Sequence, residues 1–364
     1  MKDNIFGFIG LGLIGGSIAR CIRKASPDCR IIAYTPSGHS SRQALAEGTI
    51  DEACDSLGPA FAECDLIFLC APVEYNIRYL SEIRHYLKPG ALLTDIGSTK
   101  SDIHREVNRL GMEEVFIGSH PMAGSEKTGF ESSSERLLEN AYYIITPTGK
   151  SKKEDIDRLM EVAAAVRSLP IILDPDEHDR AVAAISHLPH LIASGLVNLV
   201  RTHDSEEGLM KRLAAGGFKD ITRIASSSPE MWEQICMTNS ANVAGMLDDY
   251  IASLQELSRA LKRQDGPYIR QMFADSRSYR DSFSDKPKGS VIPEYSFTVD
   301  IADEIGAIST LSVILAAKGI SIKNIGINHN REHGEGALRI EFYTREAMEL
   351  AWERLLYYRY DLMH

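Results

Sequence analysis

The stretch GFIGLGLIGGSIA (residues 7–19) decides the fold of the first part of the chain. Gly10, Gly12 and Gly15 have the spacing G-x-G-x-x-G, between one apolar run that predicts a strand and another that predicts a helix. In this setting Gly10 permits a tight turn, Gly12 lets the backbone approach a pyrophosphate, and Gly15 lets helix and strand pack closely. Free N–H groups at the helix start, near Leu13 and Ile14, would hold the negative charge. The stretch therefore predicts a dinucleotide site, with glycines that serve packing alone as the less favoured interpretation.

Short apolar runs alternate with helical patterns over the first 147 residues, which is typical of a Rossmann-type, doubly wound α/β sheet. Near-continuous apolar strands suit a parallel sheet with helices on both faces. Ligands lie at the carboxyl ends of such strands, where the chain places Ala71 and Pro72 after one strand and Ser98 after the next. Capping of the following helix is the alternative role for Ser98. The six predicted strands cover residues 5–10, 30–35, 66–71, 92–97, 115–120 and 142–147.

The end of the second predicted strand carries Thr35, where an enzyme that uses NAD usually has Asp or Glu. The loop that follows offers hydroxyl groups and a guanidinium that could surround the 2′-phosphate of NADP. The same loop could equally be a solvated turn, so the sequence leaves NAD and NADP both open. Its polar residues are Ser37, Ser40, Ser41 and Arg42.

The rest of the chain divides into a helical part and a small α+β part. Long helices from residue 176 to about 283 are apolar on more than one side, which predicts burial against a second copy of the chain. Burial against the first domain alone is the alternative. Prolines, Lys, Gly and Ser then indicate a linker, and a βαββα pattern follows. We expect a dinucleotide-binding domain over 1–170, a helical substrate and dimerisation domain over 171–285, a linker over 286–293 and an α+β domain over 294–364.

The overall composition excludes some classes of protein. The chain has 364 residues and a net charge of −11, which argues against a nucleic-acid binder. The apolar N-terminal stretch has no basic region and is broken by glycines, and no other stretch reads as a membrane span. We therefore expect a cytoplasmic protein without membrane attachment. The cysteines form no CxxC pair and are expected to be buried free thiols: Cys21, Cys29, Cys54, Cys64, Cys70 and Cys236.

A second glycine-rich stretch, FIGSHPMAGSEKTGF (116–130), surrounds one titratable group, His120. Loops of this kind are often built around a ligand. Further along, His187 and His190 lie three residues apart and so share a face of a helix. Their flanks are apolar and carry no carboxylate, so we expect them to face a substrate and not a metal.

Two cations follow in AAGGFKDITRIASSSPEMW (214–232). Lys219 and Arg223 are four residues apart and should share a helix face, where they repel each other unless an anion or Asp220 offsets them. Arg is the residue suited to bidentate carboxylate recognition. An exposed helix start with a structural ion pair to Asp220 is the alternative interpretation.

Five segments together resemble the prephenate dehydrogenase family, which includes arogenate dehydrogenases. They are GFIGLGLIGGSIA, DIGSTK, GSHPMAGSEKTGF, SHLPH and GGFKDITRIASSSPEMW, and the resemblance covers about residues 5–285. It implies oxidative decarboxylation of prephenate to 4-hydroxyphenylpyruvate in tyrosine biosynthesis, with hydride transfer to NAD or NADP. Thr35 departs from the acid that many NAD-using members carry. The segment after residue 294 resembles, more loosely, an ACT domain, which implies feedback control by an aromatic amino acid such as tyrosine.

The resemblance also implies roles for single residues. His120 would take the proton of the ring hydroxyl as the hydride departs, and Ser98 would orient that hydroxyl or His120. Arg223 would hold a substrate carboxylate, and His190 and Lys219 would help to position the dianion. A further substrate contact, Trp232, would come from the partner subunit of a homodimer. The cofactor site would comprise Gly10, Gly12, Leu13, Ile14, Gly15, Thr35, Ala71 and Pro72, and no metal is implied.

Three other functions compete with this one. An arogenate dehydrogenase would use the same residues on a related substrate. A β-hydroxyacid dehydrogenase would use a catalytic lysine, for which Lys219 is a candidate, but leaves the loop around His120 unexplained. A non-catalytic sensor of nucleotide and amino acid is the third, and the presence of His120, Ser98 and Arg223 argues against it.

Overall fold

The computed structural model describes residues 3–124, 127–283, 295–302, 304, 306–329 and 335–363. Contacts within the chain divide it into two compact units, Met1–Gly266 and Pro267–His364. The linker predicted over 286–293 lies outside the described residues.

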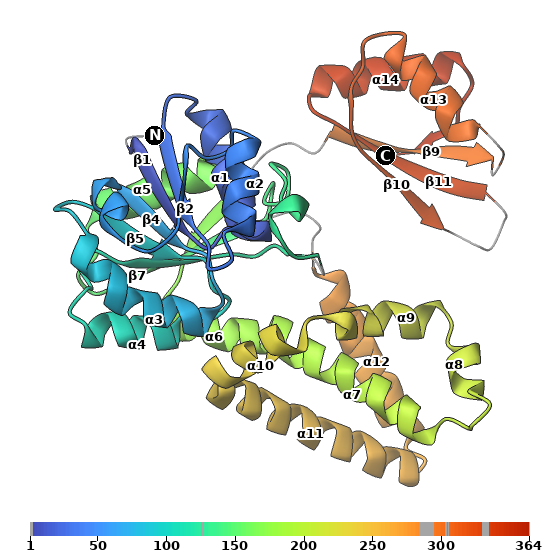
Figure 1. Cartoon of the computed structure of the whole chain (residues 1–364). Helices are drawn as coiled ribbons and strands as arrows, with labels where there is room; N and C mark the ends of the chain where they lie inside the picture. Colours follow the sequence, from blue (N-terminus) through green and yellow to red (C-terminus); the bar gives the residue numbers. More distant parts are fainter. Residues whose placement is uncertain are drawn as a thin grey trace. The chain divides into compact units, whose positions relative to one another are not determined.

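A five-stranded parallel sheet opens the first unit (Figure 1). Its strand order is β3-β2-β1-β4-β5, so the chain starts at the centre and winds outward in both directions. This order confirms the predicted doubly wound fold, and it places the loops after β1 and β4 beside one crevice. The elements are β1 (Ile5–Ile9), α1 (Leu13–Ala25), β2 (Arg30–Tyr34), α2 (His39–Ala46), β3 (Glu52–Cys54), β4 (Leu66–Leu69), α3 (Val73–Ile83), β5 (Leu92–Asp95) and α4 (Ser101–Arg109).

The last two predicted strands do not simply extend this parallel sheet. They belong to a three-stranded sheet in which β7 (Tyr142–Pro147) runs antiparallel to β6 (Ile117–Pro121) and parallel to β8 (Leu169–Ile172). One parallel bridge, Leu93–Phe116, joins it to β5. Prediction of a parallel β7 was wrong because the described part of the β6–β7 connection contains only the short 3₁₀ turn η3 (Phe130–Ser132). A parallel return usually runs through a helix that packs on the sheet, such as α5 (Lys153–Ala165) between β7 and β8.

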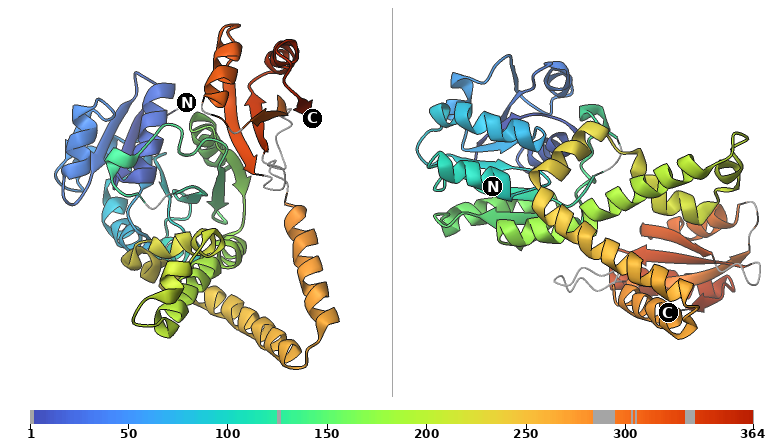
Figure 2. Two further views of the ribbon diagram at one scale, coloured as in Figure 1. Left: turned by 90° about the vertical axis from the view of Figure 1, so that its right-hand side faces the viewer. Right: turned by 90° about the horizontal axis from the view of Figure 1, so that it is seen from below.

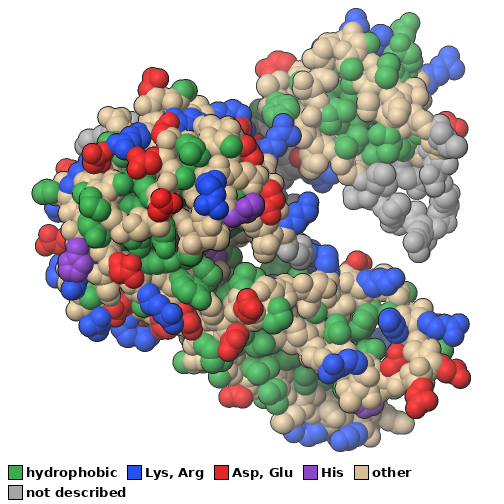
Figure 3. All heavy atoms as spheres, in the orientation of Figure 1, with side chains coloured by type: hydrophobic (Ala, Val, Ile, Leu, Met, Phe, Trp, Pro, Cys, Tyr) green, Lys and Arg blue, Asp and Glu red, His purple; other side chains and the backbone are tan. Residues whose placement is uncertain are grey.

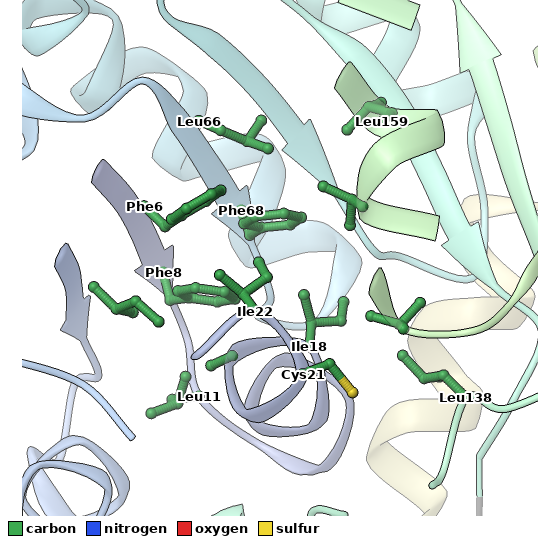
Figure 4. Packing of buried hydrophobic residues seen from close by; sticks show 14 of the residues in the cluster. Phe6, Phe8, Leu11, Ile18, Cys21, Ile22, Leu66, Phe68, Leu138 and Leu159 are labelled. Atoms are coloured by element: carbon green, nitrogen blue, oxygen red, sulfur yellow. The ribbon is translucent and has the colours of Figure 1, made fainter. Parts of the chain in front are cut away.

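Two apolar clusters cover the two faces of the parallel sheet, because successive side chains of a strand point to opposite faces. On one face Phe8 and Phe68 stack with ring centroids 4.8 Å apart, and Ile22 of α1 lies in the same cluster (Figure 4). On the other face Ile9 and Ile67 belong to a cluster with residues of α3 and α4. The strands that carry the ligand loops are thus fixed from both sides.

The remainder of the first unit is helical, as predicted. Within the region of expected long helices, residues 229–263 form two helices that meet at Asn239, whose backbone leaves the helical conformation (φ −127°, ψ 27°) and whose side chain donates to the Asp179 carbonyl. Figure 2 shows the second of them, α11, as one long helix. The elements are α6 (Pro175–Val182), the π-helical turn η4 (Ala183–His187), α7 (Leu188–His203), α8 (Leu209–Leu213), α9 (Gly216–Thr222), the 3₁₀ turn η5 (Arg223–Ser226), α10 (Pro229–Thr238) and α11 (Ser240–Lys262).

One helical run corrects an expectation from the sequence. Pro175–His203 spans 29 residues and reaches a mean hydropathy of 1.4, so by length and composition alone it could cross a membrane. Only 22% of its most apolar window is buried, and hydrophobic side chains reach the surface over the helical elements in the view of Figure 3. The same run brings His178 against β6. Because this helical run also contributes His178 to the contact with β6, its exposed apolar side chains fit burial against another protein surface better than membrane insertion.

The second unit contains α12 (Gly266–Asp281) and a four-stranded antiparallel sheet in the order β10-β11-β9-β12. The element order βαββαβ with this strand order is a ferredoxin-like arrangement, which confirms the predicted α+β fold. The short last strand was not predicted. Gly306 has a φ of 93° at the start of α13, where only glycine is relaxed. The elements are β9 (Tyr295–Ala302), α13 (Ala307–Ala316), β10 (Ile322–His329), β11 (Glu335–Phe342), α14 (Arg345–Tyr357) and β12 (Leu362–Met363).

Candidate functional site

The three glycines after β1 have three different reasons to be glycine. Gly10 has a φ of 94°, and a Cβ there would lie 2.8 Å from the carbonyl carbon of Cys70. At Gly15 a Cβ would lie 2.9 Å from the Cβ of Cys70, so α1 can approach β4 only without a side chain. At Gly12 a Cβ would meet no atom within 4 Å. Gly12 therefore borders open space at the start of α1, where Leu13 and Ile14 begin the helix and Gly12 gives it no side-chain cap.

The turn after β4 is fixed by a buried amide that the sequence analysis did not single out. Asn76 accepts a hydrogen bond from the N–H of Ala71 (3.0 Å) and donates one to the carbonyl of Leu69 (3.2 Å). Pro72 precedes the first residue of α3. These bonds hold Ala71 and Pro72 beside Gly10, on the border of the crevice between β1 and β4.

The side chains of the loop after β2 bond mainly to other residues of the same loop. The Thr35 side chain is buried, and its hydroxyl lies 3.1 Å from that of Ser41. The Arg42 guanidinium donates to the carbonyl of Ser37 (3.2 Å) and packs close to Gly38, where a Cβ would lie 2.4 Å from it. Hydroxyl groups and one cation therefore occupy the place where an acid would bind the ribose of NAD.

A buried ion pair supports the loop after β5. The Lys100 ammonium pairs with the Asp95 carboxylate and donates to the carbonyl of Ser119 (2.7 Å). Asp95 also accepts the N–H of Gly97 (2.8 Å). Half-buried Ser98 lies between these anchors, in the connection from β5 to α4. The pair thus ties the loop that carries Ser98 to the strand that carries His120.

His120 lies in β6 and heads a chain of three side chains. Its Nδ1 is 2.8 Å from Nε2 of His178, and Nδ1 of His178 is 2.8 Å from a carboxylate oxygen of Asp179. Asp179 in turn accepts the backbone N–H groups of Lys100 (2.7 Å) and Ser101 (2.8 Å). Burial holds the pKa of His120 well below its usual value, and nearby His178 and Lys100 lower it further. His120 is therefore neutral at pH 7 and able to accept a proton.

His178 and Asp179 are the residues of the site that the sequence analysis missed. They lie 58 and 59 positions after His120 in the chain, in the first turns of the helix that carries SHLPH. The sequence gives no clear signal for them, because they lie among the charged residues Asp176, Glu177 and Arg180. The distance in sequence hid their contact with His120.

The π-helical turn η4 places His187 and His190 beside Trp232. The ring of His190 stacks on the indole at 3.7 Å between centroids, and its Nδ1 donates to the carbonyl of Ser186 (3.0 Å). His187 is buried, and its Nδ1 lies 3.2 Å from the side-chain nitrogen of Asn239. Single π-helical turns occur frequently at functional sites. Trp232, which the resemblance assigned to the partner subunit, thus stacks on His190 of its own chain.

An acidic residue, Asp179, lies near His187, and its charge favours protonation of that histidine although burial lowers the pKa. The same side-chain nitrogen of Asn239 donates to the Asp179 carbonyl (2.8 Å), which links His187 to the helix turn that carries Asp179. Even so, the described part of the chain has no group of three His, Cys, Asp or Glu side chains that could hold a metal ion.

Lys219 and Arg223 do not form a single regular helix face. Lys219 lies in α9, whereas Arg223 begins the 3₁₀ turn η5, and both side chains are exposed. Both elements pack against α7. Trp232 of α10 has its indole Nε1 buried without a hydrogen-bond partner among the described residues. The substrate roles of these three residues stay predictions.

Comparison with known proteins decides the family. Residues 18–169 match the model of the prephenate dehydrogenase nucleotide-binding domain, and residues 174–275 match that of the prephenate dehydrogenase dimerization domain. The chain belongs to the prephenate dehydrogenase family. It is thus an oxidoreductase that acts on prephenate, as the resemblance implied, and it carries the family's dimerization domain.

Relatives of this family cover nearly the whole chain. Prephenate dehydrogenase of Bacillus subtilis (strain 168) is 39% identical over 348 residues, 94% of this chain and 93% of that protein. Prephenate dehydrogenase of Lactococcus lactis subsp. cremoris (strain MG1363) is 36% identical over 351 residues, 95% of each. The crystal structure of prephenate dehydrogenase from A. aeolicus, in complex with hydroxyphenyl propionate and NAD+, is 29% identical. It covers 78% of this chain and 99% of that chain, with a TM-score of 0.74.

Proposed function

We propose that His120 is the general base of the prephenate dehydrogenase reaction, and the observation that carries this is its hydrogen-bonded chain to Asp179. Nδ1 of His120 is engaged by His178, so Nε2 is left to accept the ring hydroxyl proton. The hydride leaves the same ring carbon, the ring carboxylate departs as CO2, and 4-hydroxyphenylpyruvate forms. The neutral state of His120 at pH 7, argued above from its lowered pKa, suits this task.

A nicotinamide dinucleotide fits the residues around the glycine loop. Gly12 borders open space at the uncapped start of α1, where a diphosphate finds free N–H groups and the positive end of the helix dipole. Gly10, Leu13, Ile14, Gly15, Ala71 and Pro72 would form its walls. When bound, this cofactor accepts the hydride.

NAD is the cofactor we propose, because the relative from A. aeolicus was solved with NAD+. NADP is the alternative. Thr35 and the Ser37–Arg42 loop favour it, because neither carries an acid that would repel a 2′-phosphate. Comparison of kcat/KM for the two cofactors separates them.

Substrate charge is the second part of the proposal. Prephenate carries two carboxylates, and Arg223 and Lys219 supply cations in a chain with a net charge of −11. Ser98 would orient the hydroxyl group, and His190, held by Trp232 and Ser186, would contact the substrate. Arogenate, which differs in its side chain, is the alternative substrate.

We further propose a cytoplasmic homodimer that is inhibited by tyrosine through the C-terminal unit. Exposed apolar side chains on the helical elements support the dimer: Ile185 is 68% exposed and Leu213 is 71% exposed. The ferredoxin-like unit, with Gly306 in the turn before α13, supports an ACT-type amino-acid site.

The experiment that tests the function is the absorbance of reduced nicotinamide with prephenate and arogenate in turn. His120→Asn should lower kcat by roughly 10²–10⁴ with little change in KM, because it removes an acid–base group. Unmutated protein that turns over neither substrate would refute the proposal. A raised KM at unchanged kcat in the variant would make His120 a binding residue.

A further inference from the structure

We propose that His178 and Asp179 are positioning residues that fix the tautomer of His120 and offset the positive charge it gains. The inference rests on the proposed role of His120 and adds the two residues through which that role is set. Both ring nitrogens of His178 are engaged by His120 and Asp179, and Asp179 accepts backbone N–H groups, so both residues would act through His120.

Asp179, at the end of the hydrogen-bonded series His120–His178–Asp179, determines which atom donates in each contact. Asp179 is an acceptor when ionised, and its oxygens already accept two backbone N–H groups, from Lys100 and Ser101. Hydrogen bonding to the charged form, with His178 foremost among the favourable contacts, keeps the pKa of Asp179 below its ordinary value although burial opposes this. Nδ1 of His178 must therefore carry the proton in this 2.8 Å contact.

The same logic passes from His178 to His120. A neutral His178 with its proton on Nδ1 has an unprotonated Nε2, which can only accept. Nδ1 of His120, 2.8 Å away, must then be the donor. A neutral His120 with its proton on Nδ1 leaves Nε2 unprotonated, which is the form a base requires. An acceptor at the far end thus determines which nitrogen faces the substrate.

The chain also accounts for charge during the reaction. The O–H bond of the substrate breaks, an N–H bond forms at Nε2 of His120, and the imidazole becomes an imidazolium. Its Nδ1–H then donates more strongly to His178, which is polarised by the buried carboxylate of Asp179 behind it. Attraction to that anion lowers the energy of the cation, so the base is stronger than burial alone would allow.

The three hydrogen-bonded side chains His120, His178 and Asp179 are fixed by three regular elements of secondary structure. His120 is in β6, His178 and Asp179 are in α6, and Asp179 accepts the first free N–H groups of α4, a nine-residue helix. His178 is 1% exposed and Asp179 is fully buried, so water does not compete for either contact. The other titratable groups facing His120 are Lys100 from the β5–α4 loop and His187 from η4, both of which oppose its protonation.

Three variants, a pair at His178 and one at Asp179, test the proposal in the full-length protein. His178→Gln keeps an acceptor for His120 and should retain most of kcat, whereas His178→Leu removes it and should lower kcat by roughly 10²-fold or more. Asp179→Asn keeps the shape and loses the charge, so kcat should fall at nearly unchanged KM. The acid limb of kcat/KM should also move to lower pH, because the imidazolium has lost its counter-charge.

A nitrogen NMR measurement separates this proposal from the function itself. In protein labelled with 15N-histidine, His120 should show a protonated Nδ1 and an unprotonated Nε2 without any substrate, and the signal is assigned by its loss in His120→Asn. In the His178→Leu variant we expect His120 to be a mixture of its two neutral tautomers. Equal kcat and pH profiles in His178→Gln, His178→Leu and Asp179→Asn, or a protonated Nε2 in the unmutated protein, would overturn it. Absence of turnover with an Nδ1-protonated His120 would refute the proposed function and leave the positioning intact.

Discussion

The Lys100 ammonium and the Asp95 carboxylate form an ion pair in which both side chains are fully buried. The pair connects the loop of Ser98 to Ser119, the residue before His120. Burial acts on both charges, raising the pKa of Asp95 and lowering that of Lys100, and each charge opposes the shift of the other. Removing only one partner of such a buried ion pair is strongly destabilising, because the other charge is left buried and unpaired.

Lys100→Met should therefore lower the free energy of unfolding by roughly 3–5 kcal/mol, because it leaves the Asp95 carboxylate buried without its cation. The double variant Asp95→Asn with Lys100→Met should lose less than the single one. Urea unfolding of the two variants and the unmutated protein measures both effects. A Lys100→Met variant of unchanged stability would show that the pair is not held in the charged form.

Two glycines of the nucleotide loop should respond differently to the same substitution. Gly12→Ala adds a methyl group in open space, so it should leave the Tm almost unchanged and weaken NAD binding by blocking the approach of the diphosphate. Gly15→Ala forces a contact of 2.9 Å with Cys70 and should cost about 1–3 kcal/mol of stability. Calorimetric unfolding and NAD titration of both variants check this. Equal Tm values for the two would contradict it.

The protein should lose stability in mild acid through two histidines, the half-buried His104 and the buried His187. Burial lowers the pKa of His104 and of His187 to about 4 in the fold. The unfolded chain takes up these protons first, so their contribution is complete above about pH 6.5 and is lost as the pH falls toward 4, by up to about 1.4 kcal/mol per pH unit for each histidine. Unfolding measured at pH 7 and pH 5 shows the loss.

His104→Gln isolates one of these histidines. The glutamine can keep the 2.9 Å contact with the Thr146 hydroxyl but cannot take up a proton, so the variant should be less sensitive to acid than the unmutated protein. Exposed His85 gives the control, His85→Gln. An equal loss between pH 7 and pH 5 in all three proteins would exclude His104 as a cause.

The helical elements should carry the dimer interface. Ile251 and Leu254 lie one turn apart on α11 and are 42% and 43% exposed. Changing both to Glu should shift the protein toward the monomer in light scattering coupled to size-exclusion chromatography, because charges would be buried in an apolar interface. Ser253→Glu, on another face of the same helix, should leave the dimer intact. A fully dimeric double variant would place the interface elsewhere.

Removal of residues 295–364 should abolish inhibition by tyrosine and leave turnover in place, because the catalytic groups belong to the first unit. Initial rates at increasing tyrosine, with the full chain and the shortened chain side by side, measure this. Inhibition that persists in the shortened chain would mean that tyrosine competes at the active site.

Local patterns made much of the fold predictable. The glycine spacing, the apolar runs and the boundaries of β9 and α14 follow from residues that are close in sequence. Orientation of β7 was not predictable in this way, since it depends on whether a helix fills the connection from β6. The break at Asn239 was not predicted either, since its side chain bonds to the Asp179 carbonyl, 60 residues away in the sequence.

The site was predictable where a residue stands out against its own neighbours. His120 is conspicuous among glycines, and its position in β6 followed from the apolar run before it. His178 and Asp179 look like ordinary polar positions of an amphipathic helix, and only the packing of α6 against β6 and α4 gives them a task. Exposure of Lys219 and Arg223 agrees with the alternative interpretation of an exposed helix start, whereas their spacing alone did not predict the change to a 3₁₀ turn at Arg223.

The π-helical turn η4 sets the direction around the helix axis in which His187, its last residue, points relative to His178 in α6. Nine residues of a uniform α-helix turn through about two and a half revolutions, which would send His178 and His187 to opposite sides. With the wider turn between them, both lie near Asp179 and Asn239. Deleting one residue of 183–187 would rotate His187 and His190 together, away from the base. We therefore expect a change in the length of this helix to alter substrate binding through His190, while His178 and Asp179, which precede the turn, keep their contact with His120.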